Sequence, residues 1–321
     1  MIIPVPFLTV AIVLAPTLQV DPPGVAVWNS SELEQRNAAL ATGVGPDRSS
    51  RETLADYVTS TGSHRFRFIR REYDGMDAHP EIHDEIQDVV FIQSGEATLV
   101  VGGEMINRRG DGGERIDGGV RYPVATGDII HIPAGTPHGY LVPEGGHVTY
   151  VLVRVPVMEG EPVITADTRP IQDDPPGFVM WRASELEQRN AALSTRVGPD
   201  RSSRETLADY GNPTGAHRFR YIRRESDGVD AHPEIHGGEP GAFGIIDVVF
   251  VKSGGGTLVA GGEMINRRGT GGDGIAGGTR YPVAAGDVLH IPAETPHGYL
   301  VPEGGHITYV LVRVPALEGQ N

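Results

Sequence analysis

The sequence predicts an all-β protein built from two tandem barrel or sandwich domains, each preceded by a short helical segment. Its 321 residues suit two domains, because one domain usually takes about 100–200 residues. The 44 glycines and 25 prolines indicate many turns, which a fold of short strands needs. The third and strongest observation is that one domain-sized stretch of sequence occurs twice.

The repeat is visible in long stretches that recur almost unchanged. Asp21–Gly24 recurs as Asp174–Gly177, and Gly102–Arg109 recurs as Gly261–Arg268. Roughly three-quarters of the aligned positions are identical, which indicates a duplicated domain rather than chance similarity.

The repeat also sets the domain boundaries. The first domain is predicted to span residues 21–157 and the second residues 174–316, with a glycine- and proline-containing linker at 158–173. The second copy carries extra residues within Gly237–Ile246, which predict a longer loop.

The composition excludes several functional classes. Because the chain has no cysteine, it cannot hold disulfides, thiolate metal sites, iron–sulfur clusters or a cysteine nucleophile. A formal charge of −15 argues against nucleic acid and membrane surfaces as partners. Lys252 is the single lysine, so a lysine Schiff base would depend on it alone.

The N-terminal segment, residues 1–20, has two interpretations. Ile2–Ala15 is an apolar run interrupted by Pro4 and Pro6, and it is too short to span a bilayer as a helix. It is either a secretory signal peptide, which would make the protein periplasmic or secreted, or an N-terminal strand of a cytoplasmic protein.

Within each copy, helical patterns come first and strand patterns follow. Ser30 or Ser31 is expected to cap a first helix, and Ser49–Tyr57 is interpreted as a second short helix. Alternating apolar residues then predict strands at His64–Arg71, Asp88–Gln93, Ala97–Val101, Asp128–Ile132 and His147–Val155. Turns are expected at Gly102–Gly103, Pro133–Gly135 and Pro143–Gly146.

Two segments carry the residues for chemistry. In an extended strand, alternate side chains share a face, so His79, Glu81 and His83 are expected to line up, with Asp88 opening the next strand. Further along, a strand ends in a tight proline–glycine turn, and His138 begins the next strand.

These segments resemble the two sequence motifs of the cupin superfamily, roughly G-x5-H-x-H-x3-4-E-x6-G and G-x5-P-x-G-x2-H-x3-N. The second motif fits closely, with Gly127, Pro133, Gly135 and His138 at the family spacing. Its closing asparagine is missing, because Val142 stands there.

The first motif fits in an altered form. Gly75 and Gly95 stand at its two ends, and His83 matches its second histidine. Glu81 stands where the family has its first histidine, and Asp88 stands where it has glutamate.

The second copy repeats both motifs with two departures. The loop after His236 is longer, and Glu294 replaces the turn glycine. The matching positions are Gly228, Glu234, His236, Asp247, Gly254, Gly286, Pro292 and His297.

The resemblance implies two tandem cupin jelly-roll barrels with short helical segments before each, that is, a bicupin. It further implies one divalent transition metal per barrel, with Fe, Mn, Ni and Zn all suited to imidazole and carboxylate ligands. By position, the implied metal ligands are Glu81, His83, Asp88 and His138 in the first barrel, and Glu234, His236, Asp247 and His297 in the second. If no metal binds, the same residues would form a hydrogen-bonded polar network.

Four further residues are candidates for lining a substrate pocket. Tyr140 and Tyr299 follow the motif histidine by two positions and share its inward face, although packed aromatic side chains would look the same. His79 and His232 lie on the predicted ligand face and are reserve ligands, although Pro80 can bend the strand there.

Arginines alternate along the first strand of each barrel. Arg65, Arg67 and Arg71 share one face, which could hold an anionic substrate, although salt bridges to the abundant acids are the simpler interpretation.

The sequence leaves three functional hypotheses open. The first is a metal-dependent enzyme of the dioxygenase, isomerase, decarboxylase or lyase type that acts on a small polar substrate. The second is a non-catalytic bicupin that binds a small ligand, and the third is a structural bicupin whose barrels only pack. Strands near the copy ends are expected to pair across the two barrels in a pseudo-twofold arrangement, and a homo-oligomer is a further expectation.

Overall fold

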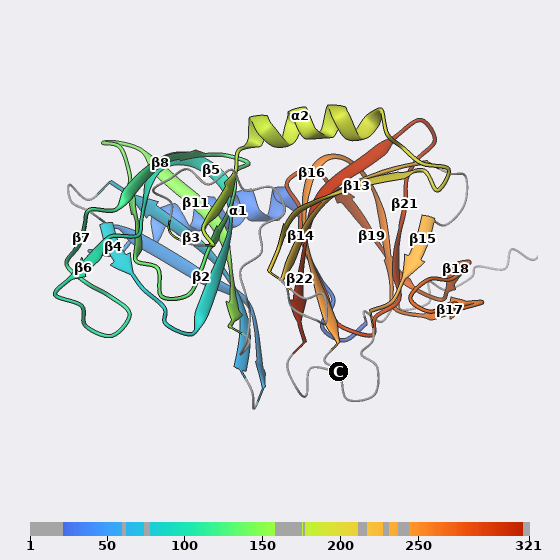
Figure 1. Ribbon diagram of the computed structural model, residues 1–321, viewed down its shortest axis with the longest axis horizontal. Helices are drawn as coiled ribbons and strands as arrows, with labels where there is room; N and C mark the ends of the chain where they lie inside the picture. The colour runs from blue at the N-terminus through green and yellow to red at the C-terminus, as the bar shows by residue number, and fades with distance from the viewer. Residues whose placement is uncertain are drawn as a thin grey trace, which may run out of the picture.

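The computed structural model describes residues 22–59, 62–73, 78–157, 175, 177–210, 217–226, 231–236 and 244–316. Within these ranges the chain forms two β-barrels side by side, one from each copy of the repeat (Figure 1). Residues 1–20, the linker at 158–173 and most of the loop at 237–246 lie outside the described residues, so their interpretation stays a prediction.

The first barrel is a run of antiparallel strands. The sheet order β9-β5-β11-β3-β2 forms one wall, and β8, β10 and β4 close the other through β5. Its strands are β2 Ser49–Thr59, β3 Gly62–Glu72, β4 Ala78–Glu81, β5 Ile86–Val101, β6 Glu104–Ile106, β7 Arg115–Asp117, β8 Val120–Ala125, β9 Ile129–Ile132, β10 His138–Leu141 and β11 His147–Pro156.

The second barrel repeats this topology strand for strand, in the order β20-β16-β22-β14-β13 with β19, β21 and β15 on the other wall. Its strands are β13 Ser202–Asp209, β14 Arg218–Glu225, β15 Ala231–Glu234, β16 Ile245–Ala260, β17 Glu263–Ile265, β18 Gly274–Ala276, β19 Thr279–Ala284, β20 Val288–Ile291, β21 His297–Leu300 and β22 His306–Pro315.

Strand β5 runs through both walls and so joins two strands that the sequence predicts separately. Its first half pairs with β9 and β11, and its second half pairs with β8 and β10. Gly95 lies between the halves with φ of +78°, and a side chain there would meet the His147 carbonyl oxygen. Only glycine fits this bend, which explains the glycine that closes the first motif.

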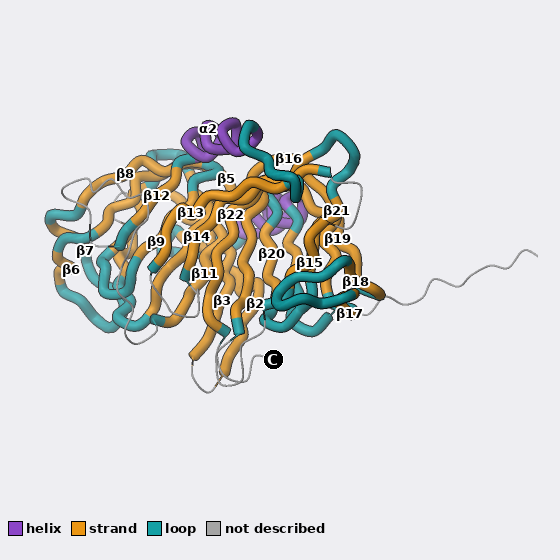
Figure 2. Tube along the Cα trace, turned by 45° about the vertical axis from the view of Figure 1, so that its right-hand side comes forward, coloured by secondary structure: helices purple, strands orange, loops and turns teal. Residues whose placement is uncertain are grey.

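Two short strands cross from one copy to the barrel of the other, and we call them the crossing strands: β1 Ala26–Trp28 and β12 Val179–Trp181. β1 pairs with β20 of the second barrel. β12 pairs with β9 of the first, and Figure 2 shows these two strands next to each other. This confirms the expected pairing across the barrels and covers an edge of each sheet.

A helix follows each crossing strand and packs on its own barrel: α1 Ser30–Thr42 on β2 and β3, and α2 Ala183–Ser194 on β13 and β14. The expected serine cap is wrong. The N-cap residue is Asn29, whose side chain makes no capping hydrogen bond. Instead, the backbone N–H of Ser30 donates to Asp287 of the opposite barrel at 2.7 Å.

The predicted second helix is also wrong, because Ser49–Tyr57 lies within strand β2. This strand pairs along its length with β3, from Ser49 opposite Arg71 to Thr59 opposite Gly62. β2 is a polar edge strand, so its sequence shows little of the apolar alternation that indicates a strand. Its pairing with β3 sets the extended conformation instead.

Three apolar clusters form the core. One lies inside each barrel, and the largest lies between the barrels and combines both copies. Phe91 of the first copy meets Phe250 of the second there, with ring centroids 5.0 Å apart. Among the described residues, neither helix has the length and apolar character needed to cross a membrane.

Candidate metal centre

Strands β4, β5 and β10 bring the predicted ligands of the first barrel together. Glu81 ends β4 and is the register partner of His138, which begins β10. His83 follows β4 by two residues, and Asp88 lies on β5 behind them. The structure therefore assembles all four residues that the motifs predict as a donor set.

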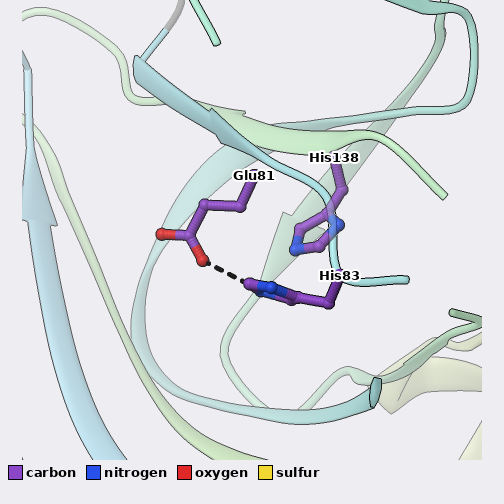
Figure 3. Close-up of side chains that lie close together, drawn as sticks. All are labelled: Glu81, His83 and His138. Carbon is purple, nitrogen blue, oxygen red and sulfur yellow. Dashed lines mark ion pairs between the residues drawn. The ribbon is translucent and has the colours of Figure 1, made fainter. Parts of the chain in front are cut away.

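The donor atoms converge on one point inside the barrel. Atoms of Glu81, His83 and His138 all lie within 4.8 Å of one another, and Figure 3 shows the three side chains facing inward. Glu81 Oε2 is 3.3 Å from His83 Nε2. Asp88 Oδ2 lies 3.3 Å from His138 Nε2 and 3.7 Å from His83 Nε2.

His138 is oriented as metal-binding histidines usually are. Its Nδ1 lies 2.9 Å from the Thr136 carbonyl oxygen, which can only accept, so Nδ1 donates. In the neutral imidazole this leaves a lone pair on Nε2, which faces the carboxylates. A histidine that ligates a metal is typically held by such a bond from its other nitrogen.

Two arginines complete the cluster, and the motifs do not predict them. Arg71 donates to Glu81 Oε1 at 3.0 Å and to the Tyr150 hydroxyl at 2.9 Å. Arg154 Nη2 donates to Glu81 Oε2 at 2.9 Å and lies 2.7 Å from His83 Nε2. The strand alternation does indicate that Arg154 faces the barrel interior. Tyr150 and Leu152 lie on the same face of the strand and are buried inside the barrel.

The cluster favours the ionised form of Glu81. Burial on its own would raise the pKa of Glu81, but the contact with His83 and the charge of Arg71 bring it well below its usual range. Burial lowers the pKa of His138, but the hydrogen bond with Asp88 more than offsets this, so the net shift is upward. The site therefore attracts positive charge at its centre, whether a proton or a metal.

The second barrel repeats the arrangement. Asp247 Oδ2 lies 3.4 Å from His236 Nε2 and 3.2 Å from His297 Nε2, and Glu234 Oε2 lies 3.3 Å from His236. The longer loop and Glu294 therefore do not prevent the donor set from assembling.

Two cavities adjoin the first donor set. A cavity of about 310 Å³ lies at the barrel mouth, bounded by Glu81 and His83 and by four arginines: Arg51, Arg67, Arg71 and Arg154. A void of about 10 Å³, close to the space of one water molecule, lies deeper against Asp88, His138 and Tyr140.

The predicted lining tyrosines are packed inside the barrels. Tyr140 is 3% exposed and stacks on Tyr150 at 5.0 Å between ring centroids, and Tyr299 stacks on Tyr309 in the same way. The hydroxyls of Tyr140 and Tyr299 have no hydrogen-bond partner within the described part of the chain. Each borders the small inner void of its barrel rather than the mouth cavity.

The remaining candidates lie elsewhere or outside the described residues. The side chains of His79 and His232 fall outside the described part, so their role as reserve ligands stays a prediction. Lys252 contacts the Gly127 carbonyl and lies over the Phe91 ring at 4.9 Å, between the barrels and not at a donor set.

The donor chemistry fits a divalent transition metal. Two imidazole nitrogens and two carboxylates converge in a buried position, and Asp88 Oδ1 is buried without a hydrogen-bond partner in the described structure. Such nitrogen and oxygen sets suit Fe, Mn, Ni and Zn.

Comparison with known proteins supports the fold. The sequence matches no protein-family model and no curated protein. Among solved structures, a salicylate 1,2-dioxygenase from Pseudaminobacter salicylatoxidans, a bicupin, is 16% identical with a TM-score of 0.55, covering 92% of this chain and 86% of its own. A protein from Pseudomonas aeruginosa described as glyoxylate-induced is 14% identical with a TM-score of 0.52, covering 94% and 93%. With its two antiparallel barrels, this chain has the bicupin fold of these solved structures.

Proposed function

We propose that the protein is a metal-dependent enzyme that acts on a small carboxylate-bearing molecule at the mouth of its first barrel. The observation that carries the proposal is the mouth cavity, which reaches the donor set at one end and is lined by arginines. Its volume of about 310 Å³ lies at the lower end of the range for small-molecule sites.

Arg67 is the residue best placed to bind the carboxylate. Of the three arginines that alternate along β3, Arg65 pairs with Asp56 and Arg71 pairs with Glu81. Arg67 makes no hydrogen bond or ion pair with any described residue, although it lines the cavity. Burial and the neighbouring charges of Arg154, Arg65 and Arg51 lower the pKa of Arg67. A carboxylate that bound its guanidinium by two hydrogen bonds would relieve that repulsion.

The site residues then divide the work. His83, His138 and one of the two carboxylates, Glu81 or Asp88, would hold the metal, which when bound would polarise an oxygen atom of the substrate. Arg67 would orient the substrate through its carboxylate, and the carboxylate left free of the metal would accept a proton. The packed barrel interior around Tyr140 would keep bulk water away from the inner side.

The solved structures indicate which substrates to test first. One variant of the Pseudoaminobacter salicylatoxidans enzyme has been solved in complex with gentisate, at 14% identity and a TM-score of 0.54, covering 94% of this chain and 89% of its own. Salicylate and gentisate are small aromatic carboxylates, which is the ligand class that Arg67 favours. At this identity only the fold carries over, so dioxygenase chemistry is a starting point for assays.

The test joins metal analysis to a substrate assay. Protein purified without a metal-affinity column should contain Fe, Mn, Ni or Zn by plasma mass spectrometry. Oxygen uptake is then measured with salicylate and gentisate, followed by a wider panel of small carboxylates. Arg67→Gln should raise KM for an active substrate by about tenfold, as loss of a charged bidentate contact implies. A protein that neither contains nor takes up metal would refute the proposal.

A second candidate is a non-catalytic bicupin that binds the same class of ligand. The observation in its favour is that each carboxylate of the donor set already has a cationic partner, Arg71 or Arg154. This alternative predicts that metal-free protein gains thermal stability from salicylate without consuming oxygen.

A further inference from the structure

We propose that Arg154 and Arg313 are internal counter-cations that occupy the donor sets and must be displaced before a divalent metal can bind. The inference rests on the proposed metal function and adds the residue that would control it. No sequence motif singles out either arginine.

The lone pair of His83 carries the argument. A guanidinium can only donate hydrogen bonds, so at 2.7 Å from Arg154 Nη2 the His83 Nε2 must be the acceptor. An imidazole nitrogen has one lone pair, and a metal ligand needs that same lone pair. His83 therefore cannot bind a metal while Arg154 holds this position.

The second N–H of the same Nη2 reaches Glu81 Oε2 at 2.9 Å. Metal–ligand bonds to nitrogen and oxygen are about 2.0–2.2 Å long. One amino group thus occupies two of the donors that would hold a metal. Arg154 Nε also faces Asp88 Oδ1 at 3.5 Å, so three of the four donors face this one side chain.

The charges point the same way. Glu81 and Asp88 supply two negative charges, and Arg71 and Arg154 supply two positive charges. With neutral histidines the cluster is formally balanced without a metal. The Arg154 side chain is 13% exposed, so solvent screens this balance little.

The second barrel has the same bridge. Arg313 Nη2 lies 2.8 Å from His236 Nε2 and 3.4 Å from Glu234 Oε2, and its Nε lies 3.5 Å from Asp247 Oδ1. The longer distance to Glu234 indicates a weaker interaction between this arginine and the donor set than in the first barrel.

The mouth cavity offers the displaced guanidinium a new partner. Arg154 lines that cavity together with Arg67, so a bound carboxylate could take up the hydrogen bonds that Arg154 gives to the donor set. Ligand and metal would then bind with positive coupling, since each favours the arginine position that the other needs.

The test measures cobalt(II) binding through its visible absorption. The His297→Ala background removes the second donor set, so that the readout comes from the first barrel. In this background Arg154→Met should tighten cobalt binding by about tenfold or more, equivalent to about 1.4 kcal/mol. The matched control is Arg67→Met, which removes the same charge from the same cavity without touching a donor, and it should change the affinity by less than about threefold.

The outcomes separate the two proposals. Equal tightening in both variants would mean simple charge repulsion and would overturn the displacement model, as would unchanged or weaker binding in Arg154→Met. If no protein in the series binds cobalt, both the inference and the metal function fail. Should Arg154→Met not fold, Arg154→Gln gives an uncharged polar side chain two bonds shorter, which withdraws the guanidinium from both donors. It should still bind cobalt more tightly than the parent, and the same affinity would overturn the inference.

Discussion

The backbone of Glu294 lies in the left-handed region, with φ of 60°, at the position where the first copy has Gly135 with φ of 71°. For a residue with a side chain, this conformation is less stable by about 1–2 kcal/mol. Nothing lies within 4 Å of where a side chain at Gly135 would begin, so backbone strain alone distinguishes the two sites.

We therefore expect Glu294→Gly to stabilise the protein by about 0.5–1 kcal/mol, after part of the relief is lost to the greater freedom of glycine in the unfolded chain. Gly135→Glu should destabilise it by a similar amount. Urea unfolding with unchanged slopes measures both, and shifts of the two midpoints in the same direction would contradict the argument.

The two motif histidines predict the metal content. Because both donor sets assemble, we expect about two metals per chain, one lost in His138→Ala, one in His297→Ala and both in the double variant. Plasma mass spectrometry of the four proteins measures this, with His147→Ala as the control, since that histidine lies outside both sets. Unchanged metal in the double variant would refute the ligand assignment.

For individual residues, motif spacing predicts the donors well, because strands β4, β5 and β10 fix their positions. It does not predict Arg154, which reaches the donors from β11 more than sixty residues along the chain from Asp88. A spacing pattern describes the ligands and not the side chains that pair with them.

The elements follow the apolar pattern where one face is buried and depart from it where a contact comes from the other copy. His147–Pro156 is a strand as predicted, because its apolar residues alternate into two cores. The sequence does not predict the helix caps, because each comes from the other barrel. Asp287 accepts from the N–H of Ser30, and Asp128 accepts from the N–H of Ala183. Local sequence patterns do not indicate such distant partners.

Each of these caps should contribute measurably to stability. Asp128 is 3% exposed and accepts hydrogen bonds from the backbone N–H groups of Ala125 at 3.0 Å and Ala183 at 2.8 Å. Asp128→Ala leaves both donors unpaired and should cost about 2 kcal/mol, with Asp128→Asn costing less because one acceptor remains. Chemical denaturation compares the variants, and equal losses for Ala and Asn would argue against the cap.

The contact between β1 and β20 should weaken in acid because of His290. Burial lowers the pKa of His290 to about 4. Its Nδ1 donates to the Gly24 carbonyl, its ring stacks on Tyr57 at 4.1 Å, and its Nε2 has no partner in the described structure. The charge of Asp247 favours protonation but does not overcome burial.

The sign follows from the two pKa values. Between pH 6.5 and 4 the unfolded chain binds a proton at this histidine that the folded protein does not, so stability falls as pH falls through this window. The loss approaches about 3 kcal/mol at pH 4, at about 1.4 kcal/mol per pKa unit. Unfolding free energies of the parent and His290→Gln measured from pH 7 to 4 test this, and parallel curves would contradict it.

At the scale of the whole molecule, the two copies of the duplicated sequence share an apolar core. The repeat predicts the two barrels and their pairing, but not how deeply the copies share a core. The largest apolar cluster draws on both copies, and each barrel takes a strand and a cap from the other. Such sharing makes the tandem chain equivalent to a closed, pseudo-symmetric dimer.

The first copy alone, residues 22–157, should therefore associate as a homodimer. As a monomer it would expose Phe66 and Phe91, which are 0% and 3% exposed in the full chain, and its β9 would have a free edge. The β1 strand of one copy can take the place of β12 on β9 of another, because Val27-Trp28 and Met180-Trp181 occupy equivalent positions. Asp128 would then cap the partner's α1 as it caps α2 here. Sedimentation equilibrium should give twice the fragment mass, with loss of association when residues 22–29 are removed. A folded, monomeric fragment would show instead that each barrel is stable without the strand and the core face that the other provides.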